Sequence, residues 1–256
     1  MWKTPRSIDY KDLRSDGRPE SDGDFRKSFA TPTVAQIDGQ PVLISQGAKA
    51  VYAYQPDNGK ELWRVEERSS HSASSRPVYG LGLIFCQTGW STGELLALRP
   101  GQPGEVIDAN TPDAGRQLKV VWQSKRNVPR KPGLLWVNDL IFTMDDGGIA
   151  SCLNALTGEA YWRERVGGNH SASPLAANGR VYFFSEEGTA TGWGRTAPSR
   201  CWRKTGWRMV SWLPRQWRDG RCSCAREATS IAWRIQVNNW HGLVNYRHFV
   251  RAGTRS

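Results

Sequence analysis

The sequence lacks long hydrophobic runs. None of the apolar stretches in its 256 residues approaches the roughly 18 residues that a membrane-spanning helix needs. Residues 1–20 also lack the apolar core of a secretory signal peptide. We therefore expect no transmembrane segment, and no signal peptide is recognisable in this chain.

Cysteine and histidine are scarce, with five and four residues respectively. The cysteines have neither the spacing of a zinc site nor that of a disulfide framework, and no two of them are adjacent. Cys86 and Cys152 lie within apolar runs, so we expect small buried thiols there.

The sequence contains no glycine-rich phosphate loop and no kinase catalytic motif. Kinase activity is therefore not expected.

The sequence does contain an internal repeat. Residues 53–63 return as residues 152–162, 99 positions later. In both copies a glycine precedes a tryptophan by four positions: Gly59 and Trp63, then Gly158 and Trp162. Short apolar runs that recur with glycine turns are typical of repeat folds, in which one unit cannot bury its apolar face alone.

Each copy divides into pieces of the length of β-strands. In the first copy, four such pieces are separated by turns that include Asp38-Gly39 and Asn58-Gly59. These dipeptides are typical of hairpins, because tight loops need the positive φ that Gly and Asn tolerate. A stretched middle copy lies between these two, and its residues 99–115 are rich in Pro, Gly, Asp and Asn, which predicts a surface insertion.

Four-stranded units repeated in this way favour an all-β fold, a partial β-propeller of four-stranded antiparallel blades. We predict propeller blades across residues 30–191. The individual blades are residues 30–66, 73–125, 133–166 and, in part, 173–191. Residues 1–29 are interpreted as the end of a truncated blade around Trp2, followed by a linker.

The repeated pattern begins with an apolar strand and a glycine turn. Ala with Leu or Tyr follows, then Thr or Asn directly before Gly, and finally Trp. It resembles the PQQ-like, quinoprotein-type propeller repeat, and in particular envelope proteins similar to the outer-membrane assembly factor BamB. The resemblance implies that Trp63, Trp122 and Trp162 pack each blade on the next. It also implies a non-enzymatic scaffold in the periplasm or cell envelope that binds other proteins and no cofactor.

Two other functions stay open, namely a fragment of a PQQ-dependent quinoprotein oxidoreductase and a sensor propeller associated with a Ser/Thr kinase. The first implies a quinone beneath a disulfide between adjacent cysteines, a pair that this chain lacks, and a calcium ion. Asp145-Asp146 could offer calcium hard oxygens. However, Glu186-Glu187 fills the same turn in the next blade, so we interpret both pairs as turn residues. We assign no catalytic, cofactor-binding or metal-binding residue.

His71 and His170 form the other recurring feature, because each begins the sequence His-Ser-Ala-Ser before the first strand of a blade. Both imidazoles could lie on one rim of the propeller channel, where a ligand site would need further His or carboxylate groups. We interpret them as structural residues that bond to the backbone. Whether they line a site at the channel mouth stays open.

The end of the chain differs from the rest. Residues 1–190 contain 22 Lys and Arg against 22 Asp and Glu, whereas residues 191–256 contain 13 against 2. The excess of Trp, Arg and Cys there is what GC-rich coding DNA yields when it is read out of frame. We predict that residues 192–256 are a frameshifted, unstructured tail and that the protein does not bind nucleic acid. The alternative is a genuine basic extension, whose arginines and tryptophans would suit single-stranded nucleic acid.

The shifted frame predicts the sequence of the gene. Codons for residues 210–216, regrouped by one base, can encode Phe-Met-Ala-Ser-Pro, which resembles the blade opening at residues 29–32. We expect the neighbouring frame to encode this string, followed by Leu-Tyr-Arg near residues 230–232. Reading the DNA checks both. Stop codons in that frame before residue 232 would contradict the prediction and favour the basic extension.

Overall fold

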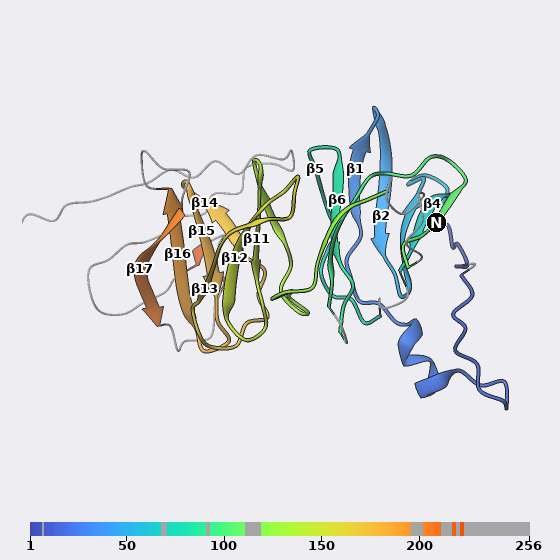
Figure 1. Ribbon diagram of the computed structural model, residues 1–256, viewed down its shortest axis with the longest axis horizontal. Coiled ribbons are helices and arrows are strands. Elements are labelled where there is room, and N and C mark those ends of the chain that lie inside the picture. Colours follow the sequence, from blue (N-terminus) through green and yellow to red (C-terminus); the bar gives the residue numbers. More distant parts are fainter. Residues whose placement is uncertain are drawn as a thin grey trace, which may run out of the picture. The chain divides into compact units, whose positions relative to one another are not determined.

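The computed structural model describes residues 1–6, 8–67, 71–90, 93–110, 119–195, 202–210, 217–218 and 221–222. Apart from the 3-10 helix η1 (Glu20–Arg26), the elements in these ranges are β-strands (Figure 1). The chain divides into two compact units. The first consists of Met1–Leu175 with Phe183–Glu187, and the second of Ala176–Tyr182 with Gly188–Ser256.

The first unit contains three sheets, and the insertion strand β8 of the second blade joins the sheet of the first. The first sheet has the order β1 (Thr33–Ile37), β2 (Gln40–Gln46), β3 (Ala50–Tyr54), β4 (Glu61–Glu66) and β8 (Glu105–Asp108). The second has the order β5 (Val78–Gly80), β6 (Leu83–Gln87), β7 (Leu95–Leu98) and β9 (Val120–Ser124). The third has the order β10 (Leu135–Val137), β11 (Leu140–Met144), β12 (Ile149–Asn154) and β13 (Ala160–Arg165).

These sheets confirm the expected fold class, a partial propeller of four-stranded antiparallel blades. The turn between β1 and β2 illustrates how the sequence directs the meander. Asp38 and Gly39 have φ values of +50° and +76°, and Ile37 pairs with Gln40 across them. Two consecutive residues with positive φ are what a two-residue hairpin loop requires. The limits of the individual predicted domains stay predictions.

The insertion in the second blade is more than the expected surface loop. Its residues Glu105–Asp108 form β8, which pairs in parallel with β4 of the first blade. Ile107 is buried in the core of that blade, and Lys119 Nζ lies 2.9 Å from Glu105 Oε2. The Pro- and Gly-rich composition misled the sequence interpretation, because this short strand depends on a partner about forty residues away in the chain.

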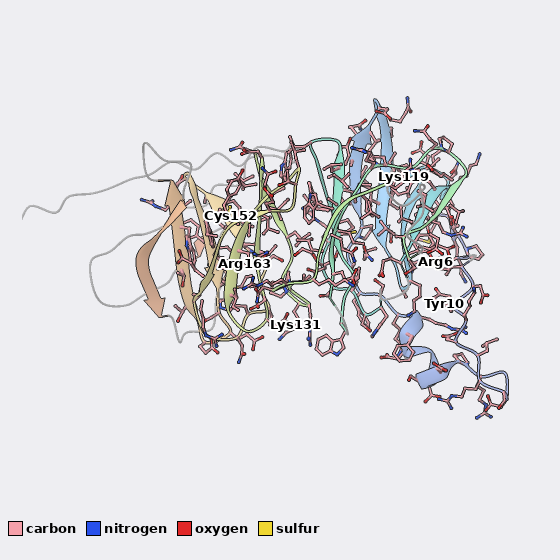
Figure 2. The ribbon with its side chains drawn as sticks, in the orientation of Figure 1. Arg6, Tyr10, Lys119, Lys131, Cys152 and Arg163 are labelled. Carbon is pink, nitrogen blue, oxygen red and sulfur yellow. The ribbon has the colours of Figure 1, made fainter. Side chains whose placement is uncertain are left out.

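The amino-terminal segment lies against the first blade. The guanidinium carbon of Arg6 is 4.8 Å from the centre of the Tyr52 ring. Figure 2 labels Arg6 and Tyr10 of this segment. Further along, Arg26 of η1 binds Asp12 with its Nη2 atom 2.6 Å from Oδ1, and it also lies over the Tyr10 ring. The segment predicted as a linker therefore has fixed contacts with β3 and within itself.

Tryptophan packs against glycine at three equivalent places. The rings of Trp2, Trp63 and Trp122 lie where a Cβ atom would stand on three turn glycines: Gly59, Gly101 and Gly158, respectively. Each of these glycines follows the third strand of a blade, and the tryptophan that contacts it precedes that blade in the chain. The indole nitrogens of Trp2 and Trp122 also donate to backbone carbonyls of the same turns, at Pro56 (2.7 Å) and Ala155 (2.8 Å).

These contacts give Trp63 and Trp122 the blade-packing role that the resemblance implied. Trp2 makes the same contact with the first blade. Trp162, the third residue expected in this role, lies with its ring tilted against Phe142 of its own blade, at a distance of 6.3 Å between ring centres.

The fourth sheet consists of β14 (Leu175–Ala177), β15 (Arg180–Phe184), β16 (Thr189–Arg195) and β17 (Trp202–Val210). Leu175 and Phe183–Phe184 belong to the first unit and the other residues of these strands to the second. Two short strands, β18 (Trp217–Arg218) and β19 (Arg221–Cys222), pair separately. Among the described residues, none forms a helix that is both long and apolar enough to cross a bilayer.

The structure differs from the predicted unstructured tail over part of its length. β16 continues to Arg195 and pairs antiparallel with β17, and the Trp193 side chain is buried. Thr and Trp favour strands. The prediction of an unstructured tail was based on codon composition and took no account of this preference. Residues 196–201, 211–216, 219–220 and 223–256 of the tail lie outside the described residues. The origin of the tail in a shifted reading frame stays a prediction.

The tryptophan contacts predict unequal effects of two glycine substitutions. Gly39 and Gly158 both have positive φ, but a Cβ on Gly39 meets nothing within 4 Å, whereas one on Gly158 lies 2.6 Å from Trp122. We expect Gly39→Ala to cost about 1 kcal/mol of unfolding free energy, from backbone strain alone. Gly158→Ala should cost about 2 to 4 kcal/mol, because the blade contact must also open. Urea denaturation measures both, and equal losses would contradict the packing role of Trp122.

Candidate functional site

The residues that precede the first strand of each blade, here called the opening segments, are residues 27–32, 71–77, 128–134 and 170–174. Neighbouring segments bind each other directly. Phe29 N donates to Ala73 O, and Ser72 N donates to Lys27 O, both at 2.8 Å. Ser74 Oγ donates to Arg130 O at 2.9 Å. In the first unit these bonds join successive blades along one rim.

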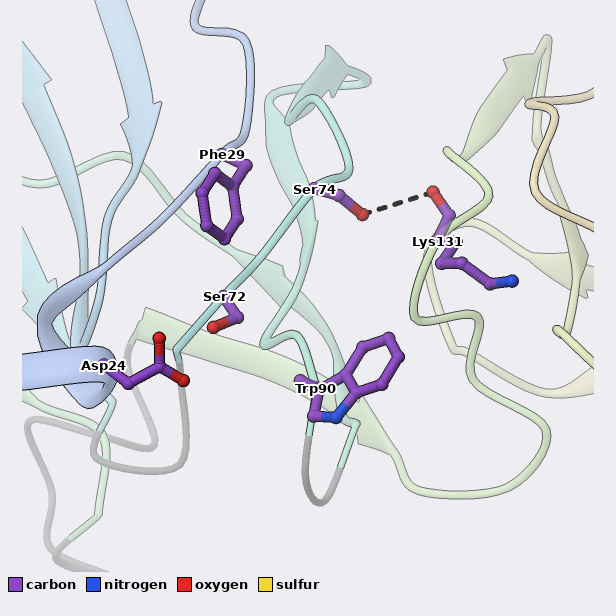
Figure 3. A pocket seen from close by; sticks show the side chains of 6 residues that line it. All are labelled: Asp24, Phe29, Ser72, Ser74, Trp90 and Lys131. Carbon is purple, nitrogen blue, oxygen red and sulfur yellow. Dashed lines mark hydrogen bonds between the residues drawn. The ribbon is translucent and has the colours of Figure 1, made fainter. Parts of the chain in front are cut away.

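A pocket of about 360 Å³ lies on this rim. Figure 3 shows the six side chains that line it: Asp24, Phe29, Ser72, Ser74, Trp90 and Lys131. The two aromatic residues come from different blades, since Phe29 precedes β1 and Trp90 follows β6. Phe29 is 67% exposed and Trp90 is 50% exposed. The pocket is therefore an open hollow between two solvent-facing aromatic rings.

The acidic pair Asp145-Asp146 holds its own turn together. Asp145 Oδ1 accepts from the backbone N–H of Ile149 at 2.7 Å, and its Oδ2 accepts from the side-chain amide of Asn127 at 3.2 Å. Asp146 Oδ2 accepts from the backbone N–H of Arg130 at 2.7 Å. The oxygens that calcium would require thus serve protein donors, in agreement with the turn interpretation.

The pair Glu186-Glu187 has the same kind of role in the turn after β15. Glu186 accepts from Ser171 Oγ and forms an ion pair with Lys131 at 3.0 Å, and these two contacts lower the pKa of Glu186. Glu187 Oε1 accepts from the backbone N–H of Asn169 at 3.1 Å, which is the main cause of its lowered pKa. Both carboxylates fix the opening segment of the fourth blade.

The two histidines are not in the pocket lining, and their surroundings differ. His170 is buried, with Nδ1 2.8 Å from Phe184 O and Nε2 3.1 Å from Gly167 O. Backbone carbonyls only accept hydrogen bonds, so the ring bonds to them with whichever nitrogen carries a proton. His170 is thus a structural residue, as interpreted from the sequence.

His71 is buried at the start of the second opening segment. Its backbone bonds to the turn after β6, where His71 N donates to Thr88 O and Trp90 N donates to His71 O, both at 3.1 Å. The imidazole meets the edge of the Phe25 ring at 5.1 Å. Burial lowers the pKa of His71, Lys49 acts in the same direction, and Asp24 opposes them. His71 positions Trp90 through its backbone.

Cys86 and Cys152 are buried free thiols, as expected, and burial raises the pKa of Cys86. Within the described ranges, no cluster of three or more His, Cys, Asp or Glu residues could hold a metal ion. The sequence did not predict a role for the pocket residues Asp24 and Trp90, because neither residue is part of the pattern that repeats between blades. Phe29 was noted only as part of a blade opening. One signal in the sequence could have pointed to Trp90. It follows the second strand of its blade, in the turn that contains Asp145-Asp146 and Glu186-Glu187 in the third and fourth blades.

The sequence model of the family described as "Outer membrane protein assembly factor BamB" matches residues 103–210. The chain carries PQQ-like propeller repeats similar to those of BamB. Beyond this family match, no curated protein matches the sequence. The chain covers 46% of the BamB from Moraxella catarrhalis in the structural comparison, so it spans about half of that protein.

Three solved structures illustrate the similarity of this BamB-like fold. The BamB of Moraxella catarrhalis aligns with 64% of the chain at 18% identity and a TM-score of 0.45. The computationally designed Ika4 protein aligns with 64% of the chain and 91% of its own length, at 10% identity and a TM-score of 0.45. A europium-containing methanol dehydrogenase aligns with 64% of the chain and 38% of its own length, at 11% identity and a TM-score of 0.42.

Burial of His71 predicts a pH-dependent stability. Because the folded pKa lies below the ordinary 6.5, His71 contributes fully above pH 6.5 and its contribution is lost as the pH falls from 6.5 toward the lower folded pKa. His71→Asn should therefore flatten the fall in unfolding free energy as the pH decreases below 6.5, by at most about 1.4 kcal/mol per pH unit.

Denaturant titration at several pH values measures this slope. Glu186→Gln is the control, since the pKa of Glu186 is lowered from 4.5 and its contribution is lost only below that pH. If the slope is the same in His71→Asn and in the unsubstituted protein, protonation of His71 does not lower the unfolding free energy, and the prediction is wrong.

Proposed function

We propose that this chain is a non-enzymatic scaffold that binds other proteins in the bacterial cell envelope, as the resemblance to BamB implies. One observation carries the proposal: Phe29 and Trp90 face solvent on either side of the rim pocket. Aromatic residues, Trp above all, are enriched among the residues that dominate protein interfaces. A pair of exposed rings beside a hollow offers such a surface.

The rim also holds this surface in place before a partner arrives. The backbone bonds between Phe29 and Ala73 and between Ser72 and Lys27 fix the first two opening segments to each other. The bond from Ser74 Oγ to Arg130 O fixes the third. A preformed surface loses little conformational freedom on binding, which favours affinity. The fold thus supports recognition by the rim.

The acidic pair Asp145-Asp146 gives the quinoprotein alternative no specific support. Pyrroloquinoline quinone would supply redox chemistry, and calcium beside it would need free oxygen ligands. The carboxylates of Asp145 and Asp146 instead accept hydrogen bonds from Asn127, Ile149 and Arg130. Nothing specific favours a kinase-associated sensor. The description of the matching family supports an envelope location.

Site-specific crosslinking in the organism that encodes the protein tests the proposal. We expect a photoreactive phenylalanine analogue at the position of Trp90 to give a discrete protein adduct on irradiation. The same analogue at the position of Leu156, which is 52% exposed, should give none. Adding Phe29→Ala to the Trp90 crosslinker variant should remove the adduct, because that change deletes a contact but leaves the crosslinker in place.

Adducts of equal yield from both positions, or from neither, would contradict a specific role of the rim. A separate titration of the purified protein with pyrroloquinoline quinone and calcium addresses the enzyme alternative. A quinone absorption that saturates at one equivalent per chain would overturn the non-enzymatic proposal.

A further inference from the structure

We propose that the rim pocket takes a cationic side chain, Arg or Lys, of the partner protein. The inference rests on the proposed scaffold function and specifies the chemistry that the rim recognises. It is carried by the groups that line the pocket, which combine one carboxylate, one ammonium group, two aromatic rings and two hydroxyl groups.

Asp24 supplies the negative charge. In Figure 3 its carboxylate lies beside Ser72 and on the same side of the pocket as Trp90. Lys131, the cationic residue of the lining, directs its ammonium group away from Ser74 in the same view, and that group is bound 3.0 Å from Glu186 Oε1. Each charge of the lining thus has a partner, Glu186 for Lys131 and Lys27 for Asp24, and the more exposed of the two ion pairs is that of Asp24.

The aromatic rings favour the same kind of occupant. The faces of Trp and Phe rings carry negative electrostatic potential and attract ammonium and guanidinium groups. The guanidinium carbon of Arg130 already lies 6.0 Å from the centre of the Trp90 ring, so this indole attracts a cation within the protein itself. Phe29 provides a second exposed ring on the opposite wall.

The hydroxyl groups add acceptors. The proton of Ser74 Oγ is used in donating to the carbonyls of Arg130 and Lys131, at 2.9 and 3.3 Å. Its lone pairs remain as acceptors toward the pocket. Arg and Lys side chains carry donors only. The hydrogen-bonding character of the wall is thus complementary to a basic side chain.

Lys27 shows that an ammonium group reaches this carboxylate. Its Nζ lies 3.1 Å from Asp24 Oδ1, and both side chains are 55% exposed. An ion pair this exposed is weak and exchanges readily. A partner residue that also stacks on Trp90 and Phe29 would displace Lys27 from Asp24.

The open shape of the pocket argues for a protein as the source of the cation. A free small cation would remain half in water between rings as exposed as Phe29 and Trp90. A side chain that projects from a protein surface brings flanking atoms, which would cover the outer faces of both rings and exclude water from the ion pair.

Short peptides test the inference on the full chain. The probe is acetyl-Gly-Arg-Gly-amide, and the matched control peptide carries citrulline, which keeps the shape of arginine without its charge. The readout is the indole N–H resonance of Trp90, assigned by its disappearance in Trp90→Phe. We expect the arginine peptide to shift this resonance in a saturable way and the citrulline peptide to leave it unchanged.

Variants of opposite effect separate recognition from general folding defects. Asp24→Asn should weaken binding of the arginine peptide about threefold to tenfold. Lys27→Met should strengthen it, because the competing ammonium is removed. Asp57→Asn, which deletes one exposed charge in the turn between β3 and β4, should leave the affinity unchanged.

Equal binding of both peptides, or an arginine affinity that is indifferent to Asp24→Asn and Lys27→Met, would overturn the inference. These outcomes are distinct from failure of the scaffold proposal. A Trp90 adduct that forms in cells while the arginine peptide does not bind would leave the scaffold function intact and assign the pocket another kind of partner side chain.

Discussion

The structure depends on one recurring contact, a tryptophan ring packed against a glycine where a Cβ atom would collide with the ring. Trp63 and Trp122 each come from the fourth strand of one blade and cover the turn after the third strand of the next, at Gly101 and Gly158. A single sheet in this protein cannot bury both of its faces alone. The tryptophan contact sets the spacing between sheets, and the cores then fill with aliphatic residues such as Ile84, Leu96 and Leu98.

The rim follows from the same spacing. Once the blades stand at a fixed separation, the opening segments come close enough for Ser72 to donate to Lys27 and for Ser74 to donate to Arg130. In the third and fourth blades, acids of the turn after the second strand bind the residues at the blade opening, as Asp146 does with Arg130. The proposed recognition uses side chains that this bonding leaves exposed, chiefly Phe29 and Trp90.

The sequence predicted the parts of the fold whose signals are local. The hairpin at Asp38-Gly39 and the repeated Gly and Trp four positions apart are both visible in a few residues, and both take the expected form. β8 was missed because its pairing with β4 is distant in the chain. The pocket was missed for a related reason, since Asp24, Phe29 and Trp90 meet only through folding and share no repeated position.

The parallel pairing of β8 with β4 also orders events during synthesis. A ribosome releases β1 to β4 first, yet the sheet of the first blade has no fifth strand until residues 105–108 have emerged, after β5, β6 and β7. Until then β4 is an open edge, able to pair with a strand of another chain. The sheet of the first blade can therefore be completed only after the first three strands of the second blade have been synthesised.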